Sequence, residues 1–382
     1  MATNNNNKAL NVPHLRFPEF NGEWEKCTIK DYGEVVTGNT PPTSNSEYYD
    51  NGSYLWASPA DLGISKNITE TKTKLSLSGF RKTRNIPKGS VLITCIGSTI
   101  GKMGMATETM SSNQQINSIV INDKSDSDFV YYAISRAFPR YLSEVGIQAV
   151  PILSKSNFEK LPNYTTCREE QDKIGYFLNL LDERIATQNK IIEDLKKLKS
   201  AITDLLFHSI ADAHTIRLGE IAHITNGAGD VQDANTEHQE DWYPFFDRSE
   251  ELKWFPTYSF DKEAVIYAGE GQSFYPRYYN GKFALHQRCY AITDFASCII
   301  PKYCYHFMNT LNSYFVRNSV GSTVPSLRMD IFQKVEIRLP PIPKQQHICK
   351  IIDAFYTKLE VEQRGISILQ ELKQFLLSQM FI

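Results

Sequence analysis

The feature that most constrains this chain is a heptad pattern between Arg168 and His208. Apolar residues recur there at alternating steps of three and four, which is the spacing of a coiled-coil seam. The seam consists of Ile174, Leu178, Leu181, Ile185, Ile192, Leu195, Ile202 and Leu206. The stretch has no proline, and its one glycine, Gly175, lies near the start, so the pattern predicts one helix of roughly 60 Å at 1.5 Å per residue. Thr166 and Glu169 predict a capping box at its start.

Each of these apolar positions has an apolar counterpart at a constant offset, the one that relates Ile174 to Ile348. The counterparts fall between Lys344 and the C-terminus, and they are Ile348, Ile352, Phe355, Leu359, Ile366, Leu369, Leu376 and Met380. Such self-similarity at a fixed interval indicates an internal repeat. The simplest arrangement pairs the two helices antiparallel, so that each buries the other's seam. The alternative is an ordinary amphipathic helix that packs only on its own domain.

The stretches before the two seams also match each other. Residues 33–41 resemble residues 218–227, and apolar strands expected at 91–96 and 118–121 correspond to strands at 264–268 and 289–292. Short helices are expected at 129–142 and 303–315. The predicted fold is therefore α+β, with two mixed α/β domains joined by two long antiparallel coiled-coil helices in a pseudo-two-fold internal repeat. The expected boundaries are 1–164 and 212–340 for the domains, and 165–211 and 341–382 for the helices.

Composition leaves the nature of any partner open. The chain has 41 Lys plus Arg against 43 Asp plus Glu, so a charged partner must be bound by local patches rather than by the whole surface. The seven cysteines form no CxxC pair, which is typical of a reducing compartment and predicts a cytoplasmic protein. No apolar run reaches the length of a membrane span. The Asn-rich first dozen residues lack the apolar core of a signal peptide, and we expect a disordered lead-in there.

The order of these features resembles the specificity subunit of type I restriction-modification systems. The resemblance covers nearly the whole chain and rests on the motifs Glu-Gln-Asp-Lys-Ile at 170–174 and Lys-Gln-Gln-His-Ile at 344–348, with Phe17-Pro18 and Gly22-Glu23-Trp24 near the front. The second copy departs from the family at Lys344, where glutamate is usual. Gly365 interrupts the flank of the second seam at a cost of about 1 kcal/mol.

This resemblance implies two target recognition domains that each bind half of a bipartite double-stranded DNA site. It implies that the long helices act as a spacer and as a docking surface for two methyltransferase (modification) subunits. Restriction/translocase subunits are implied as further partners, and no binding to a membrane is expected. The docking residues it implies are Gln171, Ile174, Gln345 and Ile348. It also implies that S-adenosylmethionine, ATP and Mg are bound only by partner subunits, so that this chain has no cofactor.

A basic run in the first half is a candidate for phosphate contact. Between Lys66 and Lys102, Glu70 is the only acid, and such a run is typical of a surface that faces phosphates. The bases are Lys66, Lys72, Lys74, Arg81, Lys82, Arg84, Lys88 and Lys102, of which Arg81, Lys82 and Arg84 form the central group. The alternative is a solvated loop.

Two further segments of the first half carry polar side chains at expected loops. Residues 97–102 lack the spacing of a P-loop, so we predict a tight glycine turn that exposes Ser98, Thr99 and Lys102. Polar side chains of this kind can contact the DNA backbone. Asn113, Gln114 and Gln115 follow, and their amides can bridge adenine N6 and N7. Their alternative role is hydrogen bonding within a turn.

The second half offers cations interleaved with aromatic residues and a trio that aligns with 113–115. The candidate DNA-binding residues are Tyr275, Arg277, Tyr278, Lys282, His286, Gln287 and Arg288. The alternative is that the tyrosines are half-buried sheet residues. The acid-rich segment 230–263 is expected to point away from phosphates.

No catalytic or metal-binding residues are predicted. The chain lacks a glycine-rich methyl-donor loop paired with an Asn-Pro-Pro-aromatic tetrad. Cys304 and His306 are close to each other in the sequence, but a single Cys/His pair on a helix is typical of a structural role rather than of a metal site. The leading hypothesis is a non-catalytic DNA-recognition subunit. Its rivals are a coiled-coil scaffold that joins two protein-binding domains, and an enzyme in its own right.

Overall fold

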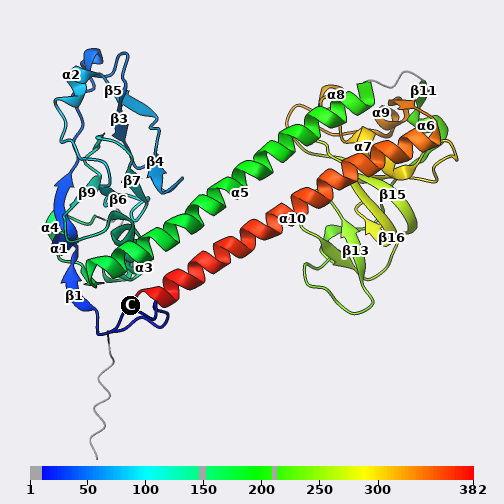
Figure 1. Cartoon of the computed structure of the whole chain (residues 1–382). Helices are drawn as coiled ribbons and strands as arrows, with labels where there is room; N and C mark the ends of the chain where they lie inside the picture. Colours follow the sequence, from blue (N-terminus) through cyan, green and yellow to red (C-terminus); the bar gives the residue numbers. More distant parts are fainter. Residues whose placement is uncertain (1–10, 146–151, 209–212) are drawn as a thin grey trace, which may run out of the picture. The chain divides into compact units, whose positions relative to one another are not determined.

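The computed structural model describes residues 11–145, 152–208 and 213–382, and it contains two compact units (Figure 1). The first unit consists of Met1–Asn189 and Arg364–Ile382, and the second consists of Lys190–Gln363. Each long helix therefore contributes one half to each unit, instead of forming a separate segment between domains. The expected disordered lead-in falls largely outside the described residues.

The first unit is built on a five-stranded sheet in the order β2-β9-β6-β7-β4, with β4 parallel to β7 and the other pairs antiparallel. These strands are β2 (Gly33–Thr37), β9 (Ile116–Ile121), β6 (Val91–Thr94), β7 (Met103–Ala106) and β4 (Asn67–Ile68). A smaller sheet contains β5 (Thr73–Leu75), β3 (Tyr54–Ala57) and β8 (Ser111–Ser112), and β1 (Glu25–Thr28) pairs with β10 (Pro162–Thr165). Besides the long helices, the described part of this unit has the α-helices α1 (Ile29–Tyr32), α2 (Leu77–Phe80), α3 (Ser127–Val145) and α4 (Lys155–Glu159), and the 3-10 helix η1 (Ser46–Tyr48).

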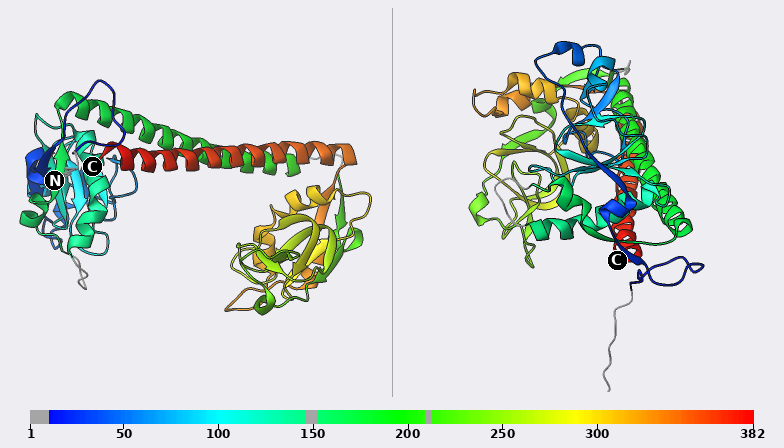
Figure 2. Two further views of the ribbon diagram at one scale, coloured as in Figure 1. Left: turned by 90° about the horizontal axis from the view of Figure 1, so that it is seen from below. Right: turned by 90° about the vertical axis from the view of Figure 1, so that its left-hand side faces the viewer.

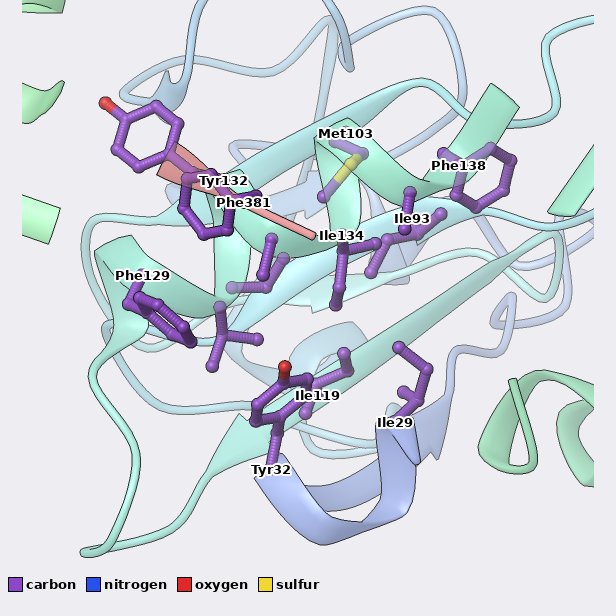
Figure 3. Close-up of a cluster of buried hydrophobic side chains, with 14 of the residues drawn as sticks. Ile29, Tyr32, Ile93, Met103, Ile119, Phe129, Tyr132, Ile134, Phe138 and Phe381 are labelled. Atoms are coloured by element: carbon purple, nitrogen blue, oxygen red, sulfur yellow. The ribbon is translucent and has the colours of Figure 1, made fainter. Parts of the chain in front are cut away.

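The core of the first unit lies between the five-stranded sheet and α3. Figure 3 shows Ile93 from β6, Ile119 from β9 and Ile134 from α3 in one cluster. Phe381, from the C-terminal end of the chain, enters the same cluster, with its ring centroid 5.4 Å from that of Phe129. The core of the first unit therefore depends on residues from both ends of the sequence.

The second unit has a six-stranded mixed sheet in the order β12-β17-β15-β16-β13-β14. Its strands are β12 (His223–Asn226), β17 (Cys289–Thr293), β15 (Phe260–Ala268), β16 (Arg277–Leu285), β13 (Tyr243–Phe246) and β14 (Lys253–Phe255). Beside it, β11 (His214–Arg217) pairs with β18 (Glu336–Leu339). The short α-helices are α6 (Leu218–Ile221), α7 (Pro301–Met308), α8 (Asn312–Asn318) and α9 (Met329–Gln333), and η2 (Val231–Asp233) is a 3-10 helix.

The single helix expected at 303–315 is two helices, α7 and α8. The break falls where side chains bind neighbouring groups: the Asn309 amide donates to the Tyr356 hydroxyl at 3.0 Å, and the Thr310 hydroxyl donates to the Phe307 carbonyl at 2.7 Å. Such short polar side chains compete with the helical hydrogen-bond ladder.

The two long helices are present as predicted, as α5 (Arg168–His208) and α10 (Ile342–Met380). All sixteen seam residues are buried or half-buried, and α10 continues through Gly365. In the first unit the start of α5 packs on the end of α10, where Lys373 Nζ lies 2.5 Å from Asp182 Oδ1. In the second unit the end of α5 packs on the start of α10, where Lys199 Nζ lies 4.0 Å from the Tyr356 ring centroid. Within each unit the helices therefore run antiparallel, side by side (Figure 2), and the predicted fold class is confirmed.

The start of α5 is held by a buried glutamate, but at a different position from the expected capping box. Thr166 Oγ1 donates to Glu170 Oε2 at 2.5 Å, in place of an exchange with Glu169. Arg16 donates to both Glu170 oxygens at 2.7 Å, so the segment before β1 is fastened to the helix.

Gln171 attaches α5 to the first unit. Its side-chain nitrogen donates to the Thr166 carbonyl at 2.8 Å and to the Lys124 carbonyl at 3.4 Å. Its oxygen accepts from the Asp126 amide at 3.0 Å. One side chain therefore joins the first turn of α5 to the loop before α3.

Gln345 makes the same three contacts in the second unit. Its nitrogen donates to the Pro340 carbonyl at 2.9 Å and to the Cys298 carbonyl at 2.8 Å, and its oxygen accepts from the Ile300 amide at 2.9 Å. Each of these partners is separated from its counterpart in the first unit by the same offset that separates Gln345 from Gln171. The sequence repeat therefore extends to individual hydrogen bonds.

These contacts correct one expectation. Gln171 and Gln345 are 2% and 0% exposed, and Ile174 and Ile348 are each 1% exposed. The four side chains are enclosed by their own units, so they are not an exposed docking surface for partner subunits. They attach the long helices to the globular parts instead.

We predict that Gln345→Ala destabilises the protein by about 2 to 4 kcal/mol, because the buried Pro340 carbonyl and the partly buried Cys298 carbonyl and Ile300 amide lose their partner. Urea denaturation measures the change. Gln346→Ala is the matched control, since Gln346 is the exposed neighbour on the same helix turn. Equal stability of the two variants would contradict this role for Gln345.

His306 gives the second unit an acid-sensitive contact between α7 and α10. Its Nε2 lies 3.0 Å from Asp353 Oδ1, and burial lowers the pKa of His306 even though Asp353 opposes this shift. In the unfolded chain a histidine takes up a proton near pH 6.5. The contribution of neutral His306 is therefore complete above that pH and is lost as the pH falls.

We predict that the wild-type protein loses stability towards urea between pH 7.5 and pH 5.5, and that His306→Gln reduces this loss. His347→Gln is the control, because His347 is exposed on α10. An identical pH dependence in wild type and His306→Gln would contradict the assignment.

Candidate nucleic-acid interface

In the first unit, the chain that leaves β2 lies directly against the loop between β8 and β9. Gly38 donates its N–H to the Ile116 carbonyl at 3.1 Å, and a Cβ on Gly38 would lie only 2.2 Å from the Ser112 oxygen. A side chain at this position would push the two segments apart. Glycine is therefore required for the close approach.

Asn39, the next residue, joins the basic run to this loop. Its N–H donates to the Ser112 carbonyl at 2.9 Å. Its side chain donates to the Lys82 carbonyl at 2.9 Å and accepts from the Arg84 N–H at 2.8 Å. Sequence reasoning missed Asn39, although an asparagine beside a glycine at a strand end is a known turn signal.

The basic run contains residues with different environments. Arg81, Lys82 and Arg84 are exposed, and Arg84 also donates to the Thr37 carbonyl at 2.8 Å. Lys66 does not share this surface. Its side chain is only 6% exposed, pairs with Asp128 and donates to Asn179 at 2.7 Å, so it joins α3 and α5 instead.

The loop at 113–115 divides between the two roles expected for it. Asn113 is 8% exposed, and its Oδ1 accepts from the Gln115 N–H at 3.0 Å. The two side chains also bond to each other at 3.2 Å. Gln114 is exposed, and its Oε1 accepts from the Thr40 hydroxyl at 2.5 Å. Asn113 and Gln115 thus shape the turn, and Gln114 faces outward.

The predicted glycine turn between β6 and β7 is confirmed. Gly97 and Gly101 adopt φ values of +95° and +90°, which favour glycine. Ser98 and Lys102 are exposed and Thr99 is half-exposed. The turn lies beside the 113–115 loop, because a Cβ on Gly97 would meet the Gln115 side chain at 3.6 Å. The structure therefore gathers three of the predicted segments around this part of the first unit.

The second unit has the same arrangement at its β16–β17 loop. Gly227 donates to the Cys289 carbonyl at 3.2 Å, and a Cβ there would lie 2.0 Å from the Leu285 oxygen. The Arg288 N–H donates to His286 Nδ1 at 3.2 Å, and Gln287 is exposed. The backbone of the third loop residue bonds to the side chain of the first in both loops. The residues that flank the central glutamine differ between the two loops.

The other candidates of the second unit are spread over separate places. Tyr278 and Arg277 are neighbours on β16 and face opposite sides of the sheet. Tyr278 bonds to Glu263 and lies near α7, where burial and Glu263 raise its pKa, so it is not on an open surface. Arg277 donates to the Ser249 carbonyl. The remaining two are exposed: Tyr275, which is 57% exposed, and Lys282, whose Nζ lies 4.6 Å from the Tyr258 ring centroid.

Part of the acid-rich segment lies against the candidate loop of the second unit. β13 runs parallel to β16, and the His286 N–H donates to the Phe246 carbonyl at 3.0 Å, which brings Asp247 to the loop. A polar cavity of about 580 Å³ lies there. It is lined by Asp230, Val231, Gln232, Asp247, Arg248, Ser249, Lys253, Glu270, His286, Gln287, Arg288 and Cys289.

Charges in this cavity are largely paired. Burial opposes ionisation of Asp247, but Lys253 Nζ at 2.7 Å and the Ser249 donors bring its pKa below the usual value. Arg288 Nη1 lies 2.6 Å from Glu270 Oε1. Because Asp247 and Glu270 form ion pairs with Lys253 and Arg288, the cavity is less basic than the 81–84 segment of the first unit.

Among the described residues, no group of His, Cys, Asp and Glu side chains is arranged to hold a metal ion. Within that same part of the chain, no helix combines the length and apolar character needed to cross a bilayer.

Comparison with known proteins identifies the family. Residues 21–197 and 211–374 each match the type I restriction modification DNA specificity domain, so the chain belongs to that family. The two matches agree with the internal repeat, since one falls on each half of the sequence. The resemblance inferred from the motifs is thereby confirmed.

Individual relatives support this assignment. The chain is 25% identical to the type I restriction enzyme MjaIX specificity subunit of Methanocaldococcus jannaschii, over 94% of this chain and 92% of that protein. It is 29% identical to the HindI specificity subunit of Haemophilus influenzae, over 46% of this chain and 39% of that protein. The crystal structure of a type I S subunit from M. genitalium has the same fold, with a TM-score of 0.67 and 18% identity over 97% of this chain and 99% of that one. Specificity subunits are the non-catalytic DNA-recognition component of these systems.

We predict that Asn39→Ala releases the 82–84 segment from the loop. The variant loses two hydrogen bonds to that segment, which should cost about 1 to 3 kcal/mol. Hydrogen exchange at the Arg84 amide should accelerate, because its acceptor is removed. Asn85→Ala is the control, since Asn85 is exposed nearby. Unchanged protection of the Arg84 amide would contradict the role of Asn39.

Proposed function

We propose that this chain recognises a bipartite duplex DNA target, with one half-site bound by each unit, and delivers modification and restriction subunits to it. The proposal extends the family assignment to a target in two halves and to docked partners. It is supported by one observation above all, which is that both units carry a similarly closed polar loop beside a glycine-supported strand end.

The first unit offers a means of binding the DNA backbone. Asn39 and Gly38 hold the exposed Arg81–Arg84 segment next to the 113–115 loop. Cations beside a loop with one outward-facing amide, that of Gln114, combine contacts to phosphates, which position a protein, with contacts to base edges, which select a sequence. Ser98, Thr99 and Lys102 would add donors on the adjoining turn.

The second unit is proposed to bind its half-site with less phosphate contact. Arg277 and Arg288 are engaged with Ser249 and Glu270, and Tyr278 is turned towards α7. Lys282 and Tyr275 remain exposed. We therefore expect the salt dependence of DNA binding to come mainly from the first unit.

Partner subunits are proposed to dock on apolar side chains that the long helices leave exposed. In the first unit these are Tyr176, Phe177 and Leu180 on α5, with Ile368, Leu372 and Phe375 on α10. In the second unit they are Ile191, Leu198 and Leu205 on α5, with Val361 on α10. Such apolar rows on a long helix are a typical docking surface for another protein. We propose two modification subunits as the occupants, with restriction/translocase subunits joining them.

The chemistry is proposed to belong to those partners, which would bind S-adenosylmethionine, ATP and Mg. The seven cysteines of this chain are all free thiols, which agrees with a proposed site of action in the cytoplasm.

The proposed function is tested by reconstituting the chain with its modification subunits and sequencing the methylated sites that the complex produces. We expect two short conserved half-sites separated by a gap of fixed length. A continuous site would contradict the division between two units. A complex that assembles but neither retains duplex DNA nor methylates it would instead favour the scaffold hypothesis.

We predict that replacing Arg81 and Lys82 together by alanine weakens DNA binding across all sequences and reduces the salt slope by up to about 2, since each lost phosphate contact removes about 0.9. Arg84 is left in place because it also supports the loop. The matched control is the exposed pair Lys124 and Lys160, replaced in the same way. An unchanged slope in the Arg81/Lys82 variant would mean that this segment faces solvent in the complex.

A further inference from the structure

The two polar loops agree bond by bond. In the first unit, Asn113 N–H donates to the Ala57 carbonyl at the end of β3, and Ile116 N–H donates back to the Asn113 carbonyl at 3.2 Å. In the second unit, His286 N–H donates to the Phe246 carbonyl at the end of β13, and Cys289 N–H donates back to the His286 carbonyl at 2.8 Å. The parallel strand pairs before the loops also correspond, with Trp56 opposite Ser111 and Phe245 opposite Ala284.

Three further bonds complete the match. Gln115 N–H donates to the Asn113 side chain as Arg288 N–H donates to the His286 ring. The carbonyls of Gln115 and Arg288 accept from Cys95 and Gly269, which occupy matching places after β6 and β15. Gly38 and Gly227 donate to the carbonyls of the residues that begin β9 and β17. The loops are therefore one structure built twice, and residues 113–115 correspond to residues 286–288.

The central residue of this shared structure is glutamine in both units. The flanking positions differ, with Asn113 against His286 and Gln115 against Arg288, and each flanking side chain is engaged inside its own unit. Gln114 and Gln287 are exposed in both cases. The side chain that points outward is thus the same, while the side chains that build the turn have changed.

From this equivalence, we propose that Gln114 and Gln287 are the matching base-contacting residues of the two units, each pairing with an adenine in its own half-site. A carboxamide offers one donor and one acceptor side by side, which fits adenine N7 and N6 in the major groove. Thr40 donates to Gln114 Oε1 and leaves the Gln114 NH₂ group and a second lone pair available. The inference rests on the proposed function, because it assigns residues to the base contacts of that same DNA site.

The test uses the reconstituted modification complex and compares methylated sites for wild type, Gln114→Ala and Gln287→Ala. Each alanine variant should lose discrimination at one A·T pair, by about 5- to 100-fold, and only in the half-site of its own unit. Each variant is therefore the control for the other. Gln333→Ala adds a control at an exposed glutamine on α9 and should leave both half-sites unchanged.

A second pair of variants should change which base is preferred, instead of only removing the preference for adenine. Gln114→Glu and Gln287→Glu replace a donor and an acceptor by two acceptors, so the preferred base at the contacted position should change from adenine towards cytosine, whose N4 group donates. Denaturation in urea establishes that each variant is folded, which is expected because both side chains are exposed.

The possible results distinguish a failure of the glutamine assignment from a failure of the proposed bipartite DNA recognition. A wild-type complex without a bipartite site would overturn the proposed function and the glutamine assignment together. A bipartite wild-type site whose two halves stay unchanged in all four variants of Gln114 and Gln287 would overturn the assignment alone. Changes that fall in the same half-site for Gln114 and Gln287 would also overturn it.

Discussion

The structure depends on the burial of one apolar face on each of two long helices. Neither α5 nor α10 could remain helical in water over its full length with that face exposed, because helix propensity alone stabilises such segments only marginally. Each helix covers the other, and its C-terminal end is also inserted into a globular core. Phe207, near the end of α5, packs 5.5 Å from Tyr303 in the second unit. Phe381, just after α10, packs 5.4 Å from Phe129 in the first. The end of each long helix therefore supplies aromatic side chains to the core of a globular part, and that core in turn buries the helix end.

The internal repeat shows which parts of the fold this arrangement requires. Phe207 and Phe381 are related by the same offset as Gln171 and Gln345, and so are the hydrogen-bond partners of the two glutamines. These residues attach the helices to the units, and both halves use the same residue types, Gln and Phe, at the equivalent positions. The electrostatic contacts nearby differ: the first unit uses Lys66 and Asp128, and the second uses Lys302 and Asp353. Packing and backbone hydrogen bonds are thus repeated more faithfully than charge.

Sequence periodicity predicted the long helices correctly because a seam of apolar residues requires a partner of the same length. Local residue preferences also predicted the central strands and the glycine turn at 97–102. The docking role that the family resemblance implied for Gln171 and Gln345 does not agree with their burial, because burial of a motif depends on what the globular unit places over it. Sequence reasoning missed Asn39 for a similar reason, since the Lys82 and Arg84 groups that Asn39 binds lie 43 and 45 positions away in the chain. The contact of the acid-rich segment with the 286–288 loop could not be predicted, because the parallel pairing of β13 with β16 has no local signal.

The central claim is that two equivalent loops, one in each unit, contact the target DNA. The most direct measurement is hydrogen exchange of the full chain in complex with its modification subunits, with and without the duplex that carries the methylated site. The account predicts that duplex binding slows exchange at backbone amides of residues 112–116 and 285–289 together. Protection confined to one of these loops, or found only along α5 and α10, would contradict it.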